Sequence, residues 1–171
     1  MKKKGARARV AILMGSDSDW EVMSTAAKRL SAFEIEHEIK VTSAHRSPAA
    51  TAAYASSARS RGLQVIIAAA GAAAHLAGVV AAHTTLPVIG VPLDATPLRG
   101  MDALLATVQM PSGIPVATVA VGGADNAALL ALQILAVTDA KIEKRLARFK
   151  EELAQQVEAK NERLQARTRG D

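Results

Sequence analysis

Five consecutive apolar residues, Val10–Met14, followed at once by Gly-Ser-Asp-Ser-Asp-Trp, constrain this chain more than any other feature. An apolar run without polar alternation predicts a strand buried on both faces. Apolar residues then recur at helical spacing, so the pattern predicts strand, tight turn and helix. Ser16, Ser18 and Asp19 fall where that helix leaves its backbone N–H groups unpaired. They either only cap the helix or also help to bind an anion such as phosphate. A single glycine, Gly15, excludes a G-x-G-x-x-G dinucleotide loop.

The following segments alternate between strand and helix patterns. Strands are predicted at Ile35–Val41, Leu63–Ala70, Pro87–Pro92 and Val116–Val121, and helices at Ala49–Arg61, Ala72–Ala82, Gly100–Val108 and Asn126–Val137. Polar alternation at Ile35–Val41 indicates a half-exposed edge strand, and the apolar Ala72–Ala82 indicates a buried helix. Pro48 fits a first helical position with Ser47 as its cap. This alternation predicts an α/β fold, a parallel sheet with helices on both faces.

The last thirty residues form a charged segment that predicts one long helix from Asp139 to Arg167. Its narrow apolar stripe has steps of three and four residues and consists of Ile142, Leu146, Phe149, Leu153 and Val157. A helix of this length exceeds a core of this size, so it either projects or packs on another subunit. We therefore expect one α/β domain over residues 1–138 and a C-terminal helix and tail over 139–171.

Composition narrows the function classes. The net charge of +5 suggests nucleic acid, but basic residues concentrate at the two ends, including Lys2–Lys4 and the segment from Lys141 to Arg169, and only 2% of residues are aromatic. We therefore expect solvated ends and no nucleic-acid partner. The chain has no Cys, and no apolar run has the length of a signal peptide or a membrane span. A cytoplasmic protein without a membrane partner is the expectation.

Polar residues gather in the loops that follow the predicted strands. These loops are Gly15–Asp19, Thr42–Ser47, Gly71–His75, Pro92–Gly100 and Val121–Asn126. In parallel sheets, ligands bind beyond the carboxyl ends of the strands, so the loops predict a binding site. Arg46 suits a phosphate or carboxylate, and His45 suits proton transfer near neutral pH. Considered without the other loops, Arg46 and His45 could equally be ordinary surface residues, and His75 could be a buried core histidine.

Other site chemistries fit less well. Asp17 and Asp19 could bind a metal, but the histidines lack paired ligand spacing, so no metal site is expected. A phosphorylation receiver domain also needs an Asp after its third strand and a Lys after its fifth, where this chain has Ala-Ala-Gly and Val-Gly-Gly. A flavin-binding domain would want aromatic residues beside the ring, and Trp20 and Tyr54 are the only Trp and Tyr.

Several motifs together resemble one family closely. They are Met14-Gly15-Ser16-Asp17-Ser18-Asp19-Trp20, Ser43-Ala44-His45-Arg46-Ser47-Pro48, Ala74-His75-Leu76, Gly90-Val91-Pro92, Gln109-Met110-Pro111-Ser112-Gly113-Ile114-Pro115 and Asn126-Ala127-Ala128-Leu129-Leu130. In this order, between roughly Ala8 and Val137, they resemble the catalytic subunits of phosphoribosylaminoimidazole carboxylase, whose bacterial form is 5-(carboxyamino)imidazole ribonucleotide mutase. The resemblance implies a flavodoxin-like three-layer fold, a homo-octamer, a ribonucleotide substrate of purine synthesis, no cofactor, and transient contact with the ATP-dependent synthetase of that substrate.

The resemblance also implies roles for individual residues. Ser16, Ser18 and Arg46 would hold the ribose phosphate, Asp19 the ribose hydroxyls, and His45 would be the general acid and base. His75, Ser43 and Gly71 would line the pocket beside the imidazole and the migrating carboxylate. These assignments agree with the loops selected by the strand pattern.

The chain departs from the family pattern at several positions. Ala69 and Ala72 stand where the family usually has glycine, Ala77 where it has proline, and the segment Val121–Asn126 looks about two residues shorter. Alanine is strained at any of these positions that requires a positive φ. A direct carboxylase using free carbon dioxide is the alternative activity, and that form tends to carry Lys at the position of Arg46. A flavodoxin-like nucleotide-binding or receiver-type module is the non-enzymatic alternative.

Overall fold

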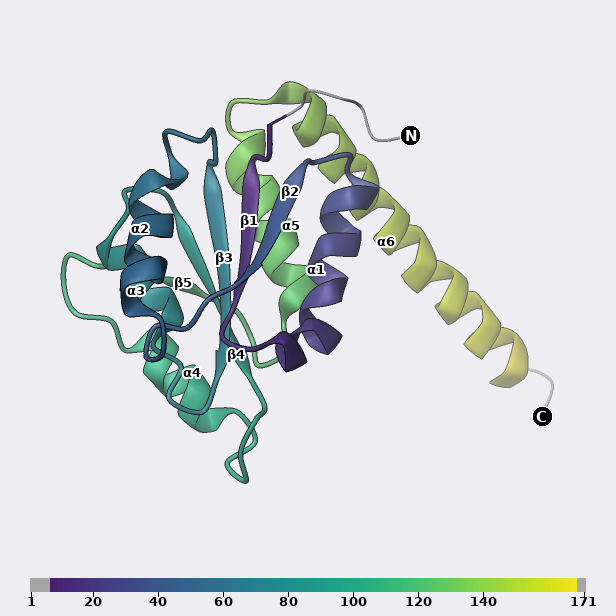
Figure 1. The fold of residues 1–171 in the computed structure, drawn as a ribbon. Helices are drawn as coiled ribbons and strands as arrows, with labels where there is room; N and C mark the ends of the chain where they lie inside the picture. Colours follow the sequence, from purple (N-terminus) through teal and green to yellow (C-terminus); the bar gives the residue numbers. More distant parts are fainter. Residues whose placement is uncertain (1–6, 169–171) are drawn as a thin grey trace.

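A five-stranded parallel sheet in the order β2-β1-β3-β4-β5 forms the centre of the molecule (Figure 1). The computed structural model describes residues 7–168, so the predicted solvated end Lys2–Lys4 lies outside them. The strands are β1 (Val10–Met14), β2 (His37–Val41), β3 (Val65–Gly71), β4 (Val88–Leu93) and β5 (Ala117–Thr118). The helices are η1 (Asp17–Asp19), a short 3-10 helix, and α1 (Trp20–Ala32), α2 (Pro48–Ala58), α3 (Leu76–Ala82), α4 (Met101–Val108), α5 (Ala124–Ala136) and α6 (Ala140–Thr168).

The central strands are buried on both faces, which explains their uninterrupted apolar sequences. Successive side chains of a strand point to opposite faces, so Ile12 packs on the side of α1 and α5 while Leu13 packs on the side of α2 and α3. All five residues of β1 and all six of β4 are buried. Figure 1 shows the two helical layers on either side of the sheet. The α/β, flavodoxin-like prediction is therefore confirmed.

Several element boundaries differ from the predicted ones. β2 is the expected edge strand but begins at His37 rather than Ile35, α2 ends at Ala58 rather than Arg61, and α5 begins at Ala124 rather than Asn126. β5 is reduced from the predicted six residues to two. The neighbouring strand β4 contains Pro92, which has no N–H to donate to β5. Beyond β5, the Gly122 N–H donates to the Pro92 carbonyl.

The predicted buried helix Ala72–Ala82 begins four residues later than expected, at Leu76. Ala72 has a φ of +50°, which lies outside the right-handed helical region and ends any helix there. Only one face of α3 is buried: Leu76 and Val80 lie in the core, whereas Ala82 is exposed. The loop from Gly71 to His75 is therefore a separate structural unit between β3 and α3.

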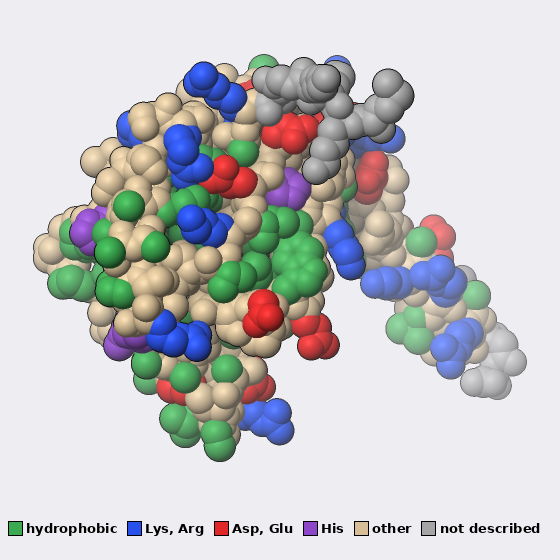
Figure 2. Space-filling view, viewed as in Figure 1, with side chains coloured by type: hydrophobic (Ala, Val, Ile, Leu, Met, Phe, Trp, Pro, Cys, Tyr) green, Lys and Arg blue, Asp and Glu red, His purple; other side chains and the backbone are tan. Residues whose placement is uncertain are grey.

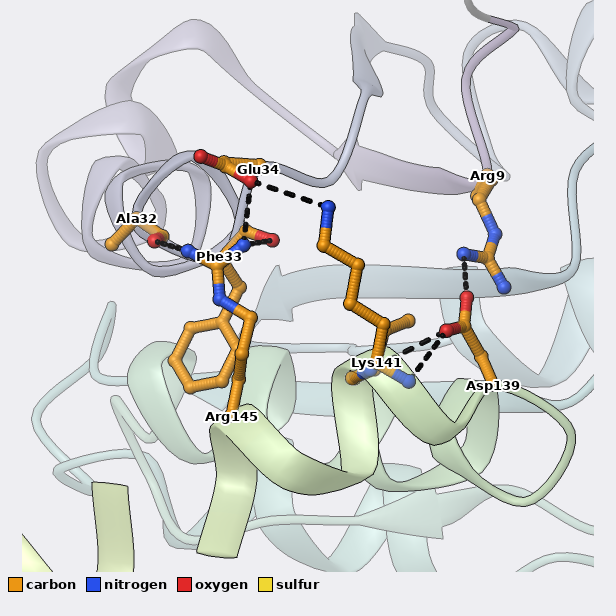
Figure 3. Close-up of polar contacts among 8 residues, drawn as sticks. Arg9, Ala32, Phe33, Glu34, Asp139, Lys141 and Arg145 are labelled. Carbon is orange, nitrogen blue, oxygen red and sulfur yellow. Dashed lines mark hydrogen bonds and ion pairs between the residues drawn. The ribbon is translucent and has the colours of Figure 1, made fainter. Parts of the chain in front are cut away.

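Helix α6 is attached to the domain at its beginning and then extends away from it (Figure 1). Arg145 donates to the Glu34 carboxylate (2.7 Å) and to the Phe33 and Ala32 carbonyls (both 3.2 Å), and Arg9 donates to Asp139 just before the helix (2.8 Å) (Figure 3). The prediction that the helix extends beyond the core is therefore confirmed.

The far half of α6 keeps apolar side chains exposed to solvent. Ile142 is buried, whereas Leu153, Val157 and Leu164 are 44%, 64% and 54% exposed. Figure 2 shows hydrophobic side chains among charged ones on this end of the helix. The same stripe that joins the helix to its own domain thus continues into a part of α6 whose apolar side chains are not covered by any other part of residues 7–168. No helix among the described residues is long and apolar enough to cross a membrane.

Candidate functional site

Loops at the carboxyl ends of β1, β2, β3 and β4 meet around one cavity of about 430 Å³. This is the edge at which a parallel sheet binds ligands, as the sequence predicted. The lining residues are Gly15, Ser16, Ser18, Asp19, Ser43, Ala44, His45, Arg46, Ala70, Gly71, Ala72, Ala73, Leu76 and Ala95. The predicted loop Val121–Asn126 contributes none of them. It forms the start of α5 instead, where Asp125 accepts two hydrogen bonds from Arg29 (2.7 and 2.9 Å).

The first loop is a short capped turn with two exposed serine hydroxyls. Ser16 Oγ accepts from the Ser18 N–H (3.3 Å), and the Asp19 carboxylate accepts from the Ser16 N–H (3.0 Å), which completes a capping box. The Ser18 hydroxyl donates to Ser16 Oγ (2.9 Å). Partial burial raises the pKa of Asp19, an effect opposed by the N–H groups of Ser16 and Gly15. The capping prediction is confirmed, and the same hydroxyls face the cavity.

The second loop holds Arg46 against the first one. Arg46 Nη2 donates to the Gly15 carbonyl (3.2 Å), and its backbone N–H donates to Ser43 Oγ (3.1 Å). Ser47 is the N-cap residue of α2 and Pro48 its first residue, as predicted, but Ser47 Oγ makes no capping bond: it accepts from the Ser43 N–H (3.0 Å) and donates to the Ser43 carbonyl (3.1 Å). The hydroxyl that would cap the helix is therefore used to close the loop.

His45 and His75 are joined by a hydrogen bond between His45 Nε2 and His75 Nδ1 (2.8 Å). Their rings are nearly perpendicular, at 79°, with centroids 5.0 Å apart. Both side chains are exposed, which excludes the alternative that His75 is a core histidine. Only one of the two facing nitrogens can carry the shared hydrogen, so one ring is the donor and the other the acceptor.

The third loop is set by backbone geometry rather than by polar side chains. A Cβ on Gly71 would lie 2.4 Å from the Ala95 Cβ, so only glycine lets the loop after β4 approach this closely. Ala69 and Ala72, the two alanines expected at glycine positions, differ in backbone conformation. Ala72 has a positive φ, whereas Ala69 lies in β3 without one. Ala72 is therefore the position, of these two, at which an alanine carries backbone strain.

All eight site residues predicted from the sequence lie at this sheet edge. Seven line the cavity, and His75 reaches it through His45. Sequence reasoning missed the small apolar wall formed by Ala44, Ala70, Ala73 and Ala95, because an alanine carries no chemical signal. Within residues 7–168, no three or more His, Asp or Glu side chains form a group that could hold a metal ion.

Comparison with known proteins places this geometry in a family. The model of the AIR carboxylase family matches residues 9–156. The chain belongs to the AIR carboxylase family. It is 53% identical, over 96% of its length and 95% of the relative's, to N5-carboxyaminoimidazole ribonucleotide mutase of Mycobacterium tuberculosis H37Rv.

Two further comparisons extend this assignment. The chain is 49% identical to the chloroplastic phosphoribosylaminoimidazole carboxylase of Vigna aconitifolia, over 91% of this chain and 28% of that longer protein. The crystal structure of Treponema denticola PurE superposes with a TM-score of 0.83 at 30% identity, covering 91% of this chain and 97% of that one. The resemblance inferred from the motifs and the fold implied by it are both confirmed.

Proposed function

We propose that this protein is an isomerase of purine biosynthesis that moves the carboxylate of 5-(carboxyamino)imidazole ribonucleotide from the exocyclic nitrogen to carbon 4. The product is 4-carboxy-5-aminoimidazole ribonucleotide. The observation that carries the proposal is one cavity lined by Ser16, Ser18, Arg46 and His45, in which the His45 ring is hydrogen-bonded to His75. High identity over nearly the whole length of named mutases supports the same activity.

Phosphate binding is assigned to Ser16, Ser18 and Arg46. Arg46 already joins the first two loops through the Gly15 carbonyl, so its guanidinium lies between the serine hydroxyls and the second loop. A guanidinium binds phosphate with two parallel hydrogen bonds, and serine hydroxyls add further donors. Asp19, at the back of the same turn, is assigned to the ribose hydroxyls. Immobilising the phosphate in this way holds the imidazole ring at a fixed distance from the histidine pair.

Proton transfer is assigned to His45. The bond between the exocyclic nitrogen and the carboxylate breaks, its electron pair returns to the nitrogen, and carbon dioxide is released inside the cavity. Carbon 4 then attacks carbon dioxide and afterwards loses its hydrogen as a proton. His45 gives one proton to the nitrogen side and takes one from carbon 4, so the enzyme returns to its initial state. The hydrogen bond to His75 holds the His45 ring in its orientation. Ser43 and Gly71 complete the wall beside the reacting atoms.

The alternative activity, direct carboxylation of aminoimidazole ribonucleotide, differs in where the carbon dioxide comes from. The name of the plant relative is the observation that favours it. A substrate labelled in its carboxylate and supplied in unlabelled bicarbonate distinguishes the two. A mutase keeps most of the label in the product. Complete exchange of the label, or efficient turnover of aminoimidazole ribonucleotide with bicarbonate alone, would establish the carboxylase instead.

We further propose that the protein assembles as a homo-octamer in the cytoplasm and contacts the ATP-dependent synthetase only transiently. Support for subunit contacts comes from a stripe of apolar side chains on α4 and the turn before it, 48% to 63% exposed: Leu98, Met101, Leu105 and Val108. The exposed stripe on the far half of α6, within the expected segment 139–171, would pack on a neighbouring subunit. Light scattering at micromolar concentration tests this assembly, and a stable monomer would refute it.

A further inference from the structure

Two of the three buried polar side chains in the described part of the chain contact each other directly behind the second site loop. Thr42 follows β2 and is 4% exposed, and Thr51 lies in the first turn of α2 and is 0% exposed. Their hydroxyl oxygens are 2.7 Å apart, which is a hydrogen bond. The third, Thr107, only donates within its own helix to the Ala103 carbonyl. Burying a hydroxyl is unfavourable unless it is paired, so the Thr42–Thr51 pair requires a reason.

The pair is the fixed end of a chain of hydrogen bonds that runs into the loop. The Thr51 hydroxyl donates to the Ser47 carbonyl (3.2 Å), so the Thr42 hydroxyl donates to Thr51. Ser47 in turn closes the loop onto Ser43 through its side chain and its backbone N–H (2.9 Å). At the other end, the Thr42 N–H donates to the Met14 carbonyl of β1 (2.8 Å). The loop is thus tied to the centre of the sheet.

From this geometry we propose that Thr42 and Thr51 are positioning residues that hold the loop carrying His45 and Arg46. The loop's other hydrogen bonds lie within it or between exposed groups, apart from the Thr51 N–H that donates to the Ser47 carbonyl (3.1 Å), so the two hydroxyls are its buried side-chain link to the sheet. Neither threonine lines the 430 Å³ cavity, and only Thr42 lines the smaller neighbouring one that shares Ser16 and Arg46 with it. This inference rests on the proposed function, because it assumes that His45 and Arg46 act on the ribonucleotide.

Four variants separate positioning from packing. Thr51→Val has nearly the same shape but lacks the hydroxyl, which removes one of the two bonds from residue 51 to the Ser47 carbonyl and leaves the Thr42 hydroxyl buried without its partner. Thr51→Ser keeps the hydroxyl. Thr42→Val with Thr51→Val removes both hydroxyls, and replacing both partners by apolar groups of the same shape is close to neutral for stability. Thr107→Val is the matched control, because it removes a buried hydroxyl that has no connection with the site.

The expected result is that stability and activity respond differently. In Thr51→Val, kcat/KM falls on the order of 10-fold or more, since a displacement of ~1 Å can cost about 100-fold. Thr51→Ser restores it, and Thr107→Val leaves it unchanged. The double variant regains thermal stability but not kcat/KM, because the loop still lacks the hydroxyl bond to the Ser47 carbonyl and keeps only the backbone bond from residue 51.

Two outcomes would overturn the inference: kcat/KM of the double variant recovering together with its stability, or Thr51→Val keeping the kcat/KM of Thr107→Val. His45→Asn in the same assay keeps the two proposals apart. If it is as active as the wild type, the site assignment fails. If it is inactive while Thr51→Val is unaffected, only the positioning role fails.

Discussion

Replacing Ala72 with glycine should change stability in the opposite direction from the same replacement at Ala73. Both alanines are exposed in the loop between β3 and α3, but only Ala72 has a positive φ, +50°. The left-handed conformation costs a non-glycine residue about 1–2 kcal/mol. Glycine in place of alanine costs about 0.5–1 kcal/mol through the greater freedom of the unfolded chain. Ala72→Gly should therefore be neutral or stabilising by up to about 1.5 kcal/mol, from these two terms.

Ala73→Gly also increases the freedom of the unfolded chain, but it relieves no strain in the folded protein. It should therefore destabilise the protein by about 0.5–1 kcal/mol. The difference between the variants isolates the strain at Ala72, because the entropy term is common to both. For a chain of this length, each kcal/mol corresponds to about 2–4 °C in Tm. Thermal unfolding of the wild type and both variants is compared at one protomer concentration, since assembly makes Tm depend on concentration. Equal losses in both variants would show that the loop carries no strain at Ala72.

Three further predictions concern the site and the base of α6. His45→Asn should fold and bind the nucleotide but lose about 10²–10⁴-fold in kcat, the range of general acid–base catalysis; near wild-type turnover would exclude this role. Arg46→Lys should weaken nucleotide binding in calorimetry although the charge remains, and Arg46→Ala should weaken it more, because the paired hydrogen bonds are lost; equal affinity in all three proteins would contradict phosphate capture. The Arg9 guanidinium beside Asp139 lowers the pKa of that carboxyl, so its contribution to stability is present above the unfolded pKa of about 3.9 and is lost as pH falls through the lowered folded value. Asp139→Asn should therefore be less stable than the wild type near pH 7 and equally stable well below pH ~3.9, and a pH-independent difference in urea midpoints would refute the linkage.

The sequence was sufficient for the layers of the fold and the edge that carries the site. Uninterrupted apolar runs such as Val10–Met14 have only one stable arrangement, a strand covered on both faces. Strand ends in a parallel sheet lie at one edge, which places His45 near the first loop without any further information. By contrast, the residues at which strands and helices begin and end were not predictable, because neighbouring groups compete locally for the same hydrogen bonds. Pro92 shortened β5, and Ser47 Oγ bonded within its own loop instead of capping α2.

Contacts between loops were beyond the reach of sequence patterns. The hydrogen bond from His45 to His75 joins residues thirty positions apart, and no periodicity predicts the pairing of two loops. The left-handed backbone at Ala72 also follows from the approach of neighbouring loops, because alanine itself disfavours that conformation. Thr51 gave no signal, since a threonine near the start of a helix is ordinarily exposed or locally bonded.

The alanines around the site keep its cavity open. Gly71 and Ala95 approach so closely that one added methyl group on Gly71 would lie 2.4 Å from the Ala95 Cβ. Ala44, Ala70 and Ala73 line the same cavity, and larger side chains there would fill the space that the nucleotide needs. Small residues carry no polar group of their own, so orientation falls to the few loop hydroxyls, Arg46 and the histidine pair. Their position must then be fixed from behind by buried hydrogen bonds such as the one between Thr42 and Thr51, so Thr51→Val tests the site without changing a residue that lines this cavity.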